Sequence, residues 1–154
     1  MAAYVTLSYS CQALGQSSAA LAAADHALAL APNTPQAHIA KANALLAMER
    51  DHEALSALGA AFQCDPKNAE IQMEMGDVCW KNLNSPDEAV KHYLTATNLN
   101  PAMAPVYVRL GDYYLLRGDT NAAHSVVQML RRISPNTPEL PVLEERWNRL
   151  SQRN

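Results

Sequence analysis

The sequence has little of what builds β-sheets or membrane spans. Phe62 is the only phenylalanine among 154 residues, and alanine dominates a composition that is 49% hydrophobic. Alanine loses no side-chain entropy in a helix, so this composition favours helices that pack closely through small side chains. No apolar run approaches the roughly 20 residues that a transmembrane helix needs. We therefore expect an all-α protein without membrane insertion.

Signatures of metal sites and of catalysis are also missing. The three cysteines, Cys11, Cys64 and Cys79, form no CxxC pair and are odd in number, so buried thiols are expected rather than disulfides. The histidines show no spacing such as HExxH, and the chain has neither a P-loop nor a G-x-S-x-G motif. The net charge of −3 disfavours nucleic acid as the main partner, because that role needs a basic surface. We expect no catalytic residue, no metal and no cofactor.

The sequence does contain an internal repeat. Prolines recur at nearly equal intervals, at Pro32, Pro66, Pro101 and Pro135, and alanines recur in step with them, at Ala20, Ala54, Ala89 and Ala123. In both columns the middle interval is one residue longer than the other two. In a column of small residues, Ser8, Ala42, Gly76 and Gly111, the last interval is the longer one. One extra residue therefore lies between Gly76 and Ala89, and the turn-like stretch 82–86 is its expected place.

Each copy of the repeat is predicted to form two helices. The first helices are expected at 2–14, 35–48, 68–82 and 103–117, and the second helices at 17–31, 51–64, 86–99 and 120–133. The repeated prolines follow these helices, because proline cannot continue a helix. Thr34 and Ser85 each precede a proline and are predicted N-caps, with Ser85 and Glu88 forming a capping box. Gly15 and Gly118 are expected in tight turns.

This pattern resembles the tetratricopeptide (TPR) family, whose helix–turn–helix repeat of about 34 residues has a small residue at the helix crossing and a closing proline. The fourth copy matches through Tyr107, Leu110, Gly111, Tyr114, Ala123 and Pro135. The second copy departs at His38 and Lys41, and the third at Gln72 and Met75, where large apolar residues are usual. The resemblance implies a right-handed solenoid of helical hairpins. The predicted parts are units 1–34, 35–68, 69–103 (with the longer turn) and 104–137, and a capping helix in 138–154.

The C-terminal end of the solenoid is expected to be covered. A ninth helix is predicted at 139–152, in which Leu143, Trp147 and Leu150 form one apolar stripe. A helix of this kind closes the last repeat and presents its polar face to water, here formed by Glu144, Glu145, Arg146, Arg149 and Arg153. The alternative is an amphipathic helix that binds a membrane or a partner, which the mixed rather than basic charges disfavour.

The N-terminal end is expected to be open. Residues 1–34 hold eleven alanines and a single charged side chain, Asp25. Val5 and Ala13 are predicted on this end face. Either upstream repeats or a second copy of the chain in a homodimer would cover it, unless an alanine-rich surface simply tolerates water.

In TPR solenoids the first helices line a concave groove, so the resemblance implies where a partner binds. The candidate residues are Tyr9, Asn43, Met73, Asp77, Trp80, Lys81, Arg109 and Asp112. Asn43 either binds a peptide backbone or is solvated, and Trp80 is either an anchor or packs against the longer turn. Tyr9 and Met73 either contact the partner or belong to the packing.

The acidic candidates also allow two interpretations. Glu74, Asp77 and Asp112 form either an acidic patch for a basic ligand or a face neutralised by Lys81 and Arg109. In the TPR clamp that holds acidic tails of heat-shock chaperones, lysine, arginine and asparagine occupy fixed positions of the first helices. Only Asn43 fits that pattern here, so binding of such a tail is not expected.

We therefore expect a scaffold or adaptor that binds a protein or peptide. The alternatives are a small TPR-type chaperone for a secreted or assembled partner, and the TPR segment of a larger enzyme. The alanine-rich composition favours a bacterial assembly, secretion or envelope system. The start, Met1–Tyr4, shows no signal peptide, which favours a cytoplasmic location only if the chain is complete.

Overall fold

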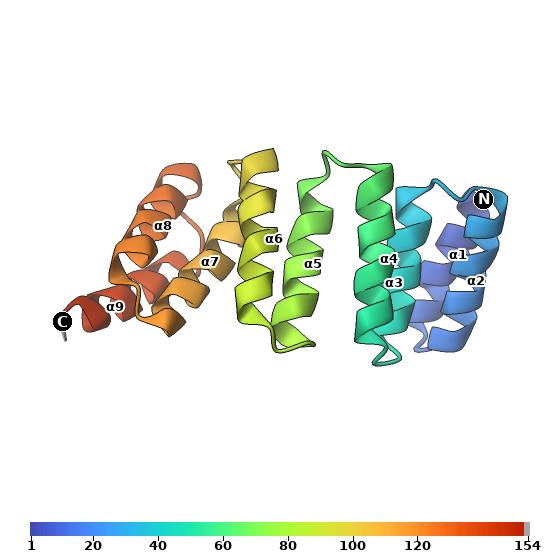
Figure 1. The fold of residues 1–154 in the computed structure, drawn as a ribbon, viewed down its shortest axis with the longest axis horizontal. Helices are drawn as coiled ribbons and strands as arrows, with labels where there is room; N and C mark the ends of the chain where they lie inside the picture. Colours follow the sequence, from blue (N-terminus) through green and yellow to red (C-terminus); the bar gives the residue numbers. More distant parts are fainter. Residues whose placement is uncertain (153–154) are drawn as a thin grey trace.

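The computed structural model describes residues 1–152, and this part of the chain forms nine α-helices without a β-strand. The helices are α1 (Ala2–Ala13), α2 (Ser17–Leu30), α3 (Pro35–Leu46), α4 (Asp51–Cys64), α5 (Ala69–Lys81), α6 (Pro86–Leu99), α7 (Ala104–Arg117), α8 (Thr120–Ile133) and α9 (Leu140–Ser151). They stack along one axis, with the two termini at opposite ends (Figure 1). The predicted all-helical repeat solenoid is confirmed. The predicted last unit, 138–154, extends past the described part of the chain.

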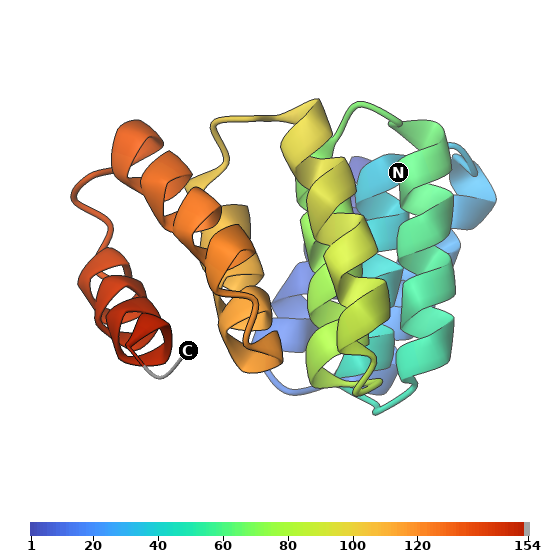
Figure 2. The same cartoon turned by 60° about the vertical axis from the view of Figure 1, so that its left-hand side comes forward.

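Helices pack first within a hairpin and then between hairpins. α1 packs on α2, α3 on α4, α5 on α6 and α7 on α8, and each second helix also contacts the next first helix. α1 and α3 lie behind α2 and α4 in Figure 1, and α5 and α7 lie behind α6 and α8 in Figure 2. We call the surface formed by α1, α3, α5 and α7 the first-helix face. No described helix is long and apolar enough to cross a bilayer.

One residue with positive φ closes each turn between paired helices. These residues are Gly15 (71°), Glu49 (58°), Asn84 (49°) and Gly118 (71°). In three turns the next residue donates its N–H to the carbonyl five positions back: Gln16 to Cys11, Arg50 to Leu45 and Asp119 to Tyr114. In the α5–α6 turn the corresponding bond runs six positions back, from Ser85 to Cys79. The extra residue of the third copy therefore lies within 80–83. The unit boundaries themselves stay a prediction.

The columns of small residues form the helix crossings. Ala20, Ala54, Ala89 and Ala123 are all completely buried. At the α1–α2 crossing, the buried Ser8 hydroxyl donates a 2.8 Å hydrogen bond to the Ala20 carbonyl. At the α5–α6 crossing, a Cβ on Gly76 would lie 2.4 Å from Cε1 of Tyr93. Only a residue without a side chain fits there, because packed cores leave no room for an extra methyl.

The predicted N-caps are correct in position but not in their side-chain bonds. Thr34 and Ser85 precede α3 and α6, yet neither side chain accepts a hydrogen bond from its helix. The Ser85 hydroxyl instead donates to the Leu83 carbonyl at 3.2 Å, so the predicted capping box is not formed. Proline in the first turn already removes one free N–H, which reduces the need for a cap. Side-chain caps occur elsewhere, at Asn68 and Asp119.

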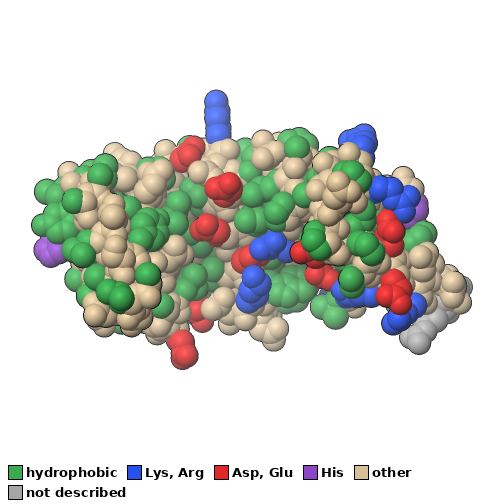
Figure 3. All heavy atoms as spheres, turned by 180° about the vertical axis from the view of Figure 1, so that it is seen from behind, with side chains coloured by type: hydrophobic (Ala, Val, Ile, Leu, Met, Phe, Trp, Pro, Cys, Tyr) green, Lys and Arg blue, Asp and Glu red, His purple; other side chains and the backbone are tan. Residues whose placement is uncertain are grey.

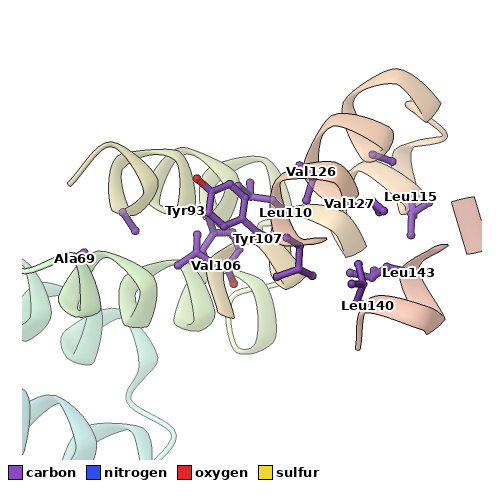
Figure 4. Close-up of a cluster of buried hydrophobic side chains, with 14 of the residues drawn as sticks. Ala69, Tyr93, Val106, Tyr107, Leu110, Leu115, Val126, Val127, Leu140 and Leu143 are labelled. Carbon is purple, nitrogen blue, oxygen red and sulfur yellow. The ribbon is translucent and has the colours of Figure 1, made fainter. Parts of the chain in front are cut away.

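The largest hydrophobic cluster lies in the C-terminal half and extends into the cap (Figure 4). Tyr93, Val106 and Leu110 are its buried centre, and Leu143 of α9 is buried against them from the end. Trp147 packs on the same cluster and donates its indole N–H to the Thr120 carbonyl at 3.0 Å. Together these contacts place α9 over α7 and α8, as a capping helix requires. Cys11 and Cys79 are buried free thiols, whereas Cys64 is partly exposed.

The N-terminal end is apolar and poor in charge. In the view from behind, the uncharged end on the left contrasts with the mixed charges elsewhere (Figure 3). Within residues 1–34 the exposed large hydrophobic residues are Met1, Tyr4, Leu7, Tyr9, Leu14 and Leu30. Val5, which the sequence placed on the open end face, is instead buried against Ala24, Ala27, Ala37 and Ala40. The predicted position of Val5 is therefore wrong, because this side of α1 faces α2 and α3.

Candidate functional site

Two hollows flank α5 on the first-helix face. α1 packs directly on α3, and α7 on α9, but α5 approaches neither α3 nor α7 as closely. The first hollow, of about 400 Å³, is lined by Asp77, Trp80, Lys81, Tyr93, Val108, Arg109, Asp112, Leu116 and Arg146. The second hollow, of about 300 Å³, is lined by Asn43, Leu46, Leu58, Glu74, Asp77, Val78, Lys81 and Asn82. Asp77 and Lys81 lie between the two, so the hollows adjoin along the ridge that α5 forms.

Asp77 is the centre of a hydrogen-bond network in the first hollow. The Arg109 guanidinium donates through Nε and Nη2 to both carboxylate oxygens, with Nη2 2.6 Å from Oδ2. The Tyr93 hydroxyl donates at 2.8 Å, and Lys81 Nζ lies 3.0 Å from Oδ2. Burial alone would raise the pKa of Asp77, but the hydrogen bonds from Arg109, Tyr93 and Lys81 outweigh it and hold the pKa below its ordinary value. Asp77 is therefore ionised and fully engaged near neutral pH.

Two ion pairs connect α5 to α7 and α7 to α9. Asp77 of α5 pairs with Arg109 of α7, and Asp112 of α7 pairs with Arg146 of α9. Asp77 and Asp112 occupy equivalent places, each one residue after a member of the small column. Each of these acidic residues is thus bound by an arginine two helices further along the chain, and the capping helix α9 supplies the last arginine. The sequence allows Asp77 and Asp112 to be either an acidic patch for a basic ligand or acids neutralised by neighbouring basic residues. These contacts fit the second interpretation.

The wall of the first hollow also has an apolar part. Trp80 meets Tyr113 edge to face, with ring centroids 6.0 Å apart and planes at 68°. The Tyr113 hydroxyl donates to Asp87 at 2.7 Å, which fixes this ring from α6. Leu116 is 67% exposed at the rim. An exposed leucine beside a half-buried tryptophan can bury an apolar side chain of a partner, and the charged residues beside them can orient it.

Glu74 differs from the other acids of the first-helix face. Within the described residues, its carboxylate takes part in no hydrogen bond and no ion pair, although it is partly buried in the second hollow. Burial raises its pKa first, and the negative charges of Glu70 and Asp77 raise it further. The second hollow, which contains this unpaired acid, therefore adjoins a hollow whose acids are paired.

The eight predicted site residues fall into three groups. Five of them line the first hollow together: Asp77, Trp80, Lys81, Arg109 and Asp112. Asn43 lines the second hollow. Tyr9 lies exposed on α1 outside both hollows, and Met73 packs against the main hydrophobic cluster.

Sequence reasoning misses two residues of the first hollow. Tyr93 lies on a second helix, so the repeat gives no reason to expect it here, yet its hydroxyl reaches Asp77 through the space that Gly76 leaves open. Arg146 is expected from the sequence on the polar surface of the cap. It follows Asp112 by one repeat length, much as Arg109 follows Asp77, and this parallel is the signal that the sequence offers.

Comparison with known families identifies the repeat. The family model described as the Psidin N-terminal TPR repeats region matches residues 8–140. The chain belongs to this TPR family. As in other TPR domains, its stacked hairpins present an extended surface suited to protein–protein interaction. Among curated proteins, none matches significantly.

Solved structures share the TPR fold at low sequence identity. MamA superposes with a TM-score of 0.78 at 16% identity, over 88% of this chain and 79% of its own. PilF of Pseudomonas aeruginosa superposes with a TM-score of 0.81 at 21% identity, over 98% of this chain and 68% of its own. YrrB superposes with a TM-score of 0.70 at 18% identity, over 96% of this chain and 84% of its own. At these identities the likeness concerns the fold of the TPR domain alone.

Proposed function

We propose that this TPR domain is a non-catalytic scaffold that binds a segment of a partner protein along the first-helix face. The observation that carries the proposal is the first hollow, where an exposed leucine and a half-buried tryptophan adjoin fixed ion pairs. Trp80 and Leu116 supply the apolar contact, and Arg109 and Asp112 supply polar groups at the rim. Interfaces with an apolar centre and a polar rim typically bind protein segments.

The state of the ionisable groups favours binding over acid–base catalysis. A catalytic base needs a pKa near the working pH and a free lone pair aimed at a substrate. Asp77 has neither property, because three donors occupy its oxygens and hold its pKa low. Tyr93 cannot serve as the acid, since burial and its bond to Asp77 raise its pKa far above the ordinary value.

The comparisons support a peptide segment as the ligand. YrrB is described as a TPR protein with an unusual peptide-binding site, and it matches 96% of this chain in fold. The matched family is named for the N-terminal TPR repeats region of Psidin, where the repeats are one part of a longer protein. The alternative that this chain is the TPR segment of a larger enzyme stays a prediction. The narrower setting, a bacterial assembly, secretion or envelope system, stays a prediction from composition, as does the chaperone role.

Selection of random nine-residue peptides displayed on phage, followed by calorimetric titration of the enriched peptide, tests the proposal. Substituting Asn43→Ala with Trp80→Ala should weaken binding about thirtyfold or more, since a buried tryptophan anchor contributes about 2 kcal/mol or more. Leu94→Ala is the matched control, because it truncates an exposed apolar side chain on α6, a second helix. Equal affinity of the double variant and the control would exclude the first-helix face as the binding site.

A further inference from the structure

The first-helix face contains one partly buried carboxylate, that of Glu74, which no side chain in residues 1–152 neutralises. Asp77 is bound by Arg109 and Lys81, and Asp112 by Arg146. Glu74 lies one turn before Asp77 on α5 and has no such partner in residues 1–152. A partly buried carboxylate without a partner is costly, and this cost is relieved when a positive charge arrives.

The second hollow combines this charge with an apolar wall. Leu46 of α3, Leu58 of α4 and Val78 of α5 line it beside Asn43 and Glu74. Lysine and arginine side chains match this division, since an aliphatic stem carries their charged head. Asn43 adds a side-chain carbonyl oxygen that can accept a second hydrogen bond from the head group.

Two cations already lie near the second hollow, but both are engaged. Lys81 Nζ is 3.0 Å from Asp77, and Arg109 binds the same carboxylate from the side of the first hollow. Glu70, on the same helix as Glu74 and one turn earlier, adds further negative charge. Burial raises the pKa of Glu74 most, and the negative charges of Glu70 and Asp77 raise it further. An incoming cation is therefore attracted there, and an anion is repelled.

We propose that the second hollow binds a lysine or arginine side chain of the partner segment, with its cationic head on Glu74 and Asn43. This inference rests on the proposed function, since the same segment would occupy both hollows. It fixes the direction in which the segment lies: the apolar anchor lies beside Trp80, and the basic residue lies toward α3.

The test uses the peptide enriched by phage selection on the wild-type protein. The enriched sequences should share one basic position, and replacing that residue by norleucine, which keeps the stem but removes the charge, should lower the affinity about tenfold or more. The same replacement should have little effect on binding to Glu74→Gln, so the two changes are non-additive. Selection on Glu74→Lys should enrich an acidic residue at that position.

Three controls test whether Glu74 itself binds the cation, whether that cation is a side chain of the peptide, and whether the variant remains folded. Glu70→Gln removes the same charge from the same helix outside the hollow and should keep the basic preference. N-terminal acetylation of the peptide should leave its affinity unchanged if a side chain, rather than the terminal amine, occupies the hollow. Glu74→Gln should keep or raise thermal stability, because it removes an unpaired charge.

The outcomes distinguish the two proposals. Enriched peptides that need Trp80 but show no basic position would overturn this inference and leave the proposed function intact. A basic preference that persists on Glu74→Gln would likewise overturn it. Failure to enrich any peptide on the first-helix face would overturn both.

Discussion

Gly76 lies where α5 crosses α6, and the ring of Tyr93 fills the space that a side chain would take. A Cβ added there would lie 2.4 Å from Cε1 and 2.7 Å from Cδ1 of Tyr93. Tyr93 is 1% exposed and its hydroxyl is bound to Asp77, so the ring has nowhere to move without breaking that bond. Gly76→Ala therefore tests the packing of the fold and the geometry of the first hollow together.

The expected loss follows from three contributions. Overpacking a core costs about 1–3 kcal/mol. Alanine gains about 1 kcal/mol over glycine inside a helix. A weakened hydrogen bond to the ionised Asp77 costs about 1.5 kcal/mol or more. We expect Gly76→Ala to lose about 2 kcal/mol of unfolding free energy, which lowers the melting temperature by about 4–8 °C.

Gly59 provides the matched control. It lies inside α4, and nothing comes within 4 Å of a Cβ added to it. Gly59→Ala should raise stability by up to about 1 kcal/mol through helix propensity alone. Circular dichroism of urea and thermal unfolding measures both variants. If Gly76→Ala proved as stable as Gly59→Ala, the close approach of Tyr93 to α5 would be refuted.

Two further predictions concern charge and the N-terminal end. Because the folded pKa of Asp77 lies below the ordinary value of about 4, its ion pair should contribute stability that is fully present above that value and lost as pH falls through the lower folded pKa. In urea titrations Asp77→Asn should thus be clearly less stable than wild type at pH 7, and the difference should shrink below pH 4; a difference independent of pH would contradict the ion pair. We also propose that the apolar N-terminal face self-associates: Leu7→Glu, at a position 48% exposed, should give a monomer in sedimentation over a broad concentration range, whereas a wild-type chain that is monomeric throughout would refute the homodimer.

The helices can be predicted from the sequence almost to their ends, because the repeat gives each boundary four times over. Proline after each second helix and glycine in the first and last turns are local signals that need no tertiary information. The two hollows cannot be predicted in this way. They depend on how far α5 stands from α3 and α7, and no single residue encodes that separation.

The side-chain bonds show the same limit. The sequence identifies Asp77 and Asp112 as acidic residues of the first-helix face, but whether they are free or paired depends on Arg109 and Arg146, which lie on later helices of the stack. Ser85 has the sequence of a cap, yet its hydroxyl donates to the Leu83 carbonyl and accepts no N–H of α6. In both cases several partners are chemically suitable, and only the packing selects among them.

The position of Arg146 affects how far this solenoid can be treated as modular. In a repeat protein the terminal helix is usually a capping helix that shields the last hairpin from water and can be exchanged for another. Here α9 also supplies a wall of the first hollow, through the pair between Arg146 and Asp112. Grafting a generic capping helix, or extending the array by another hairpin, would expose Asp112 as a free acid and change the charge of the hollow. Any lengthened or re-capped version of this domain therefore needs a basic residue at the place of Arg146 to keep Asp112 paired.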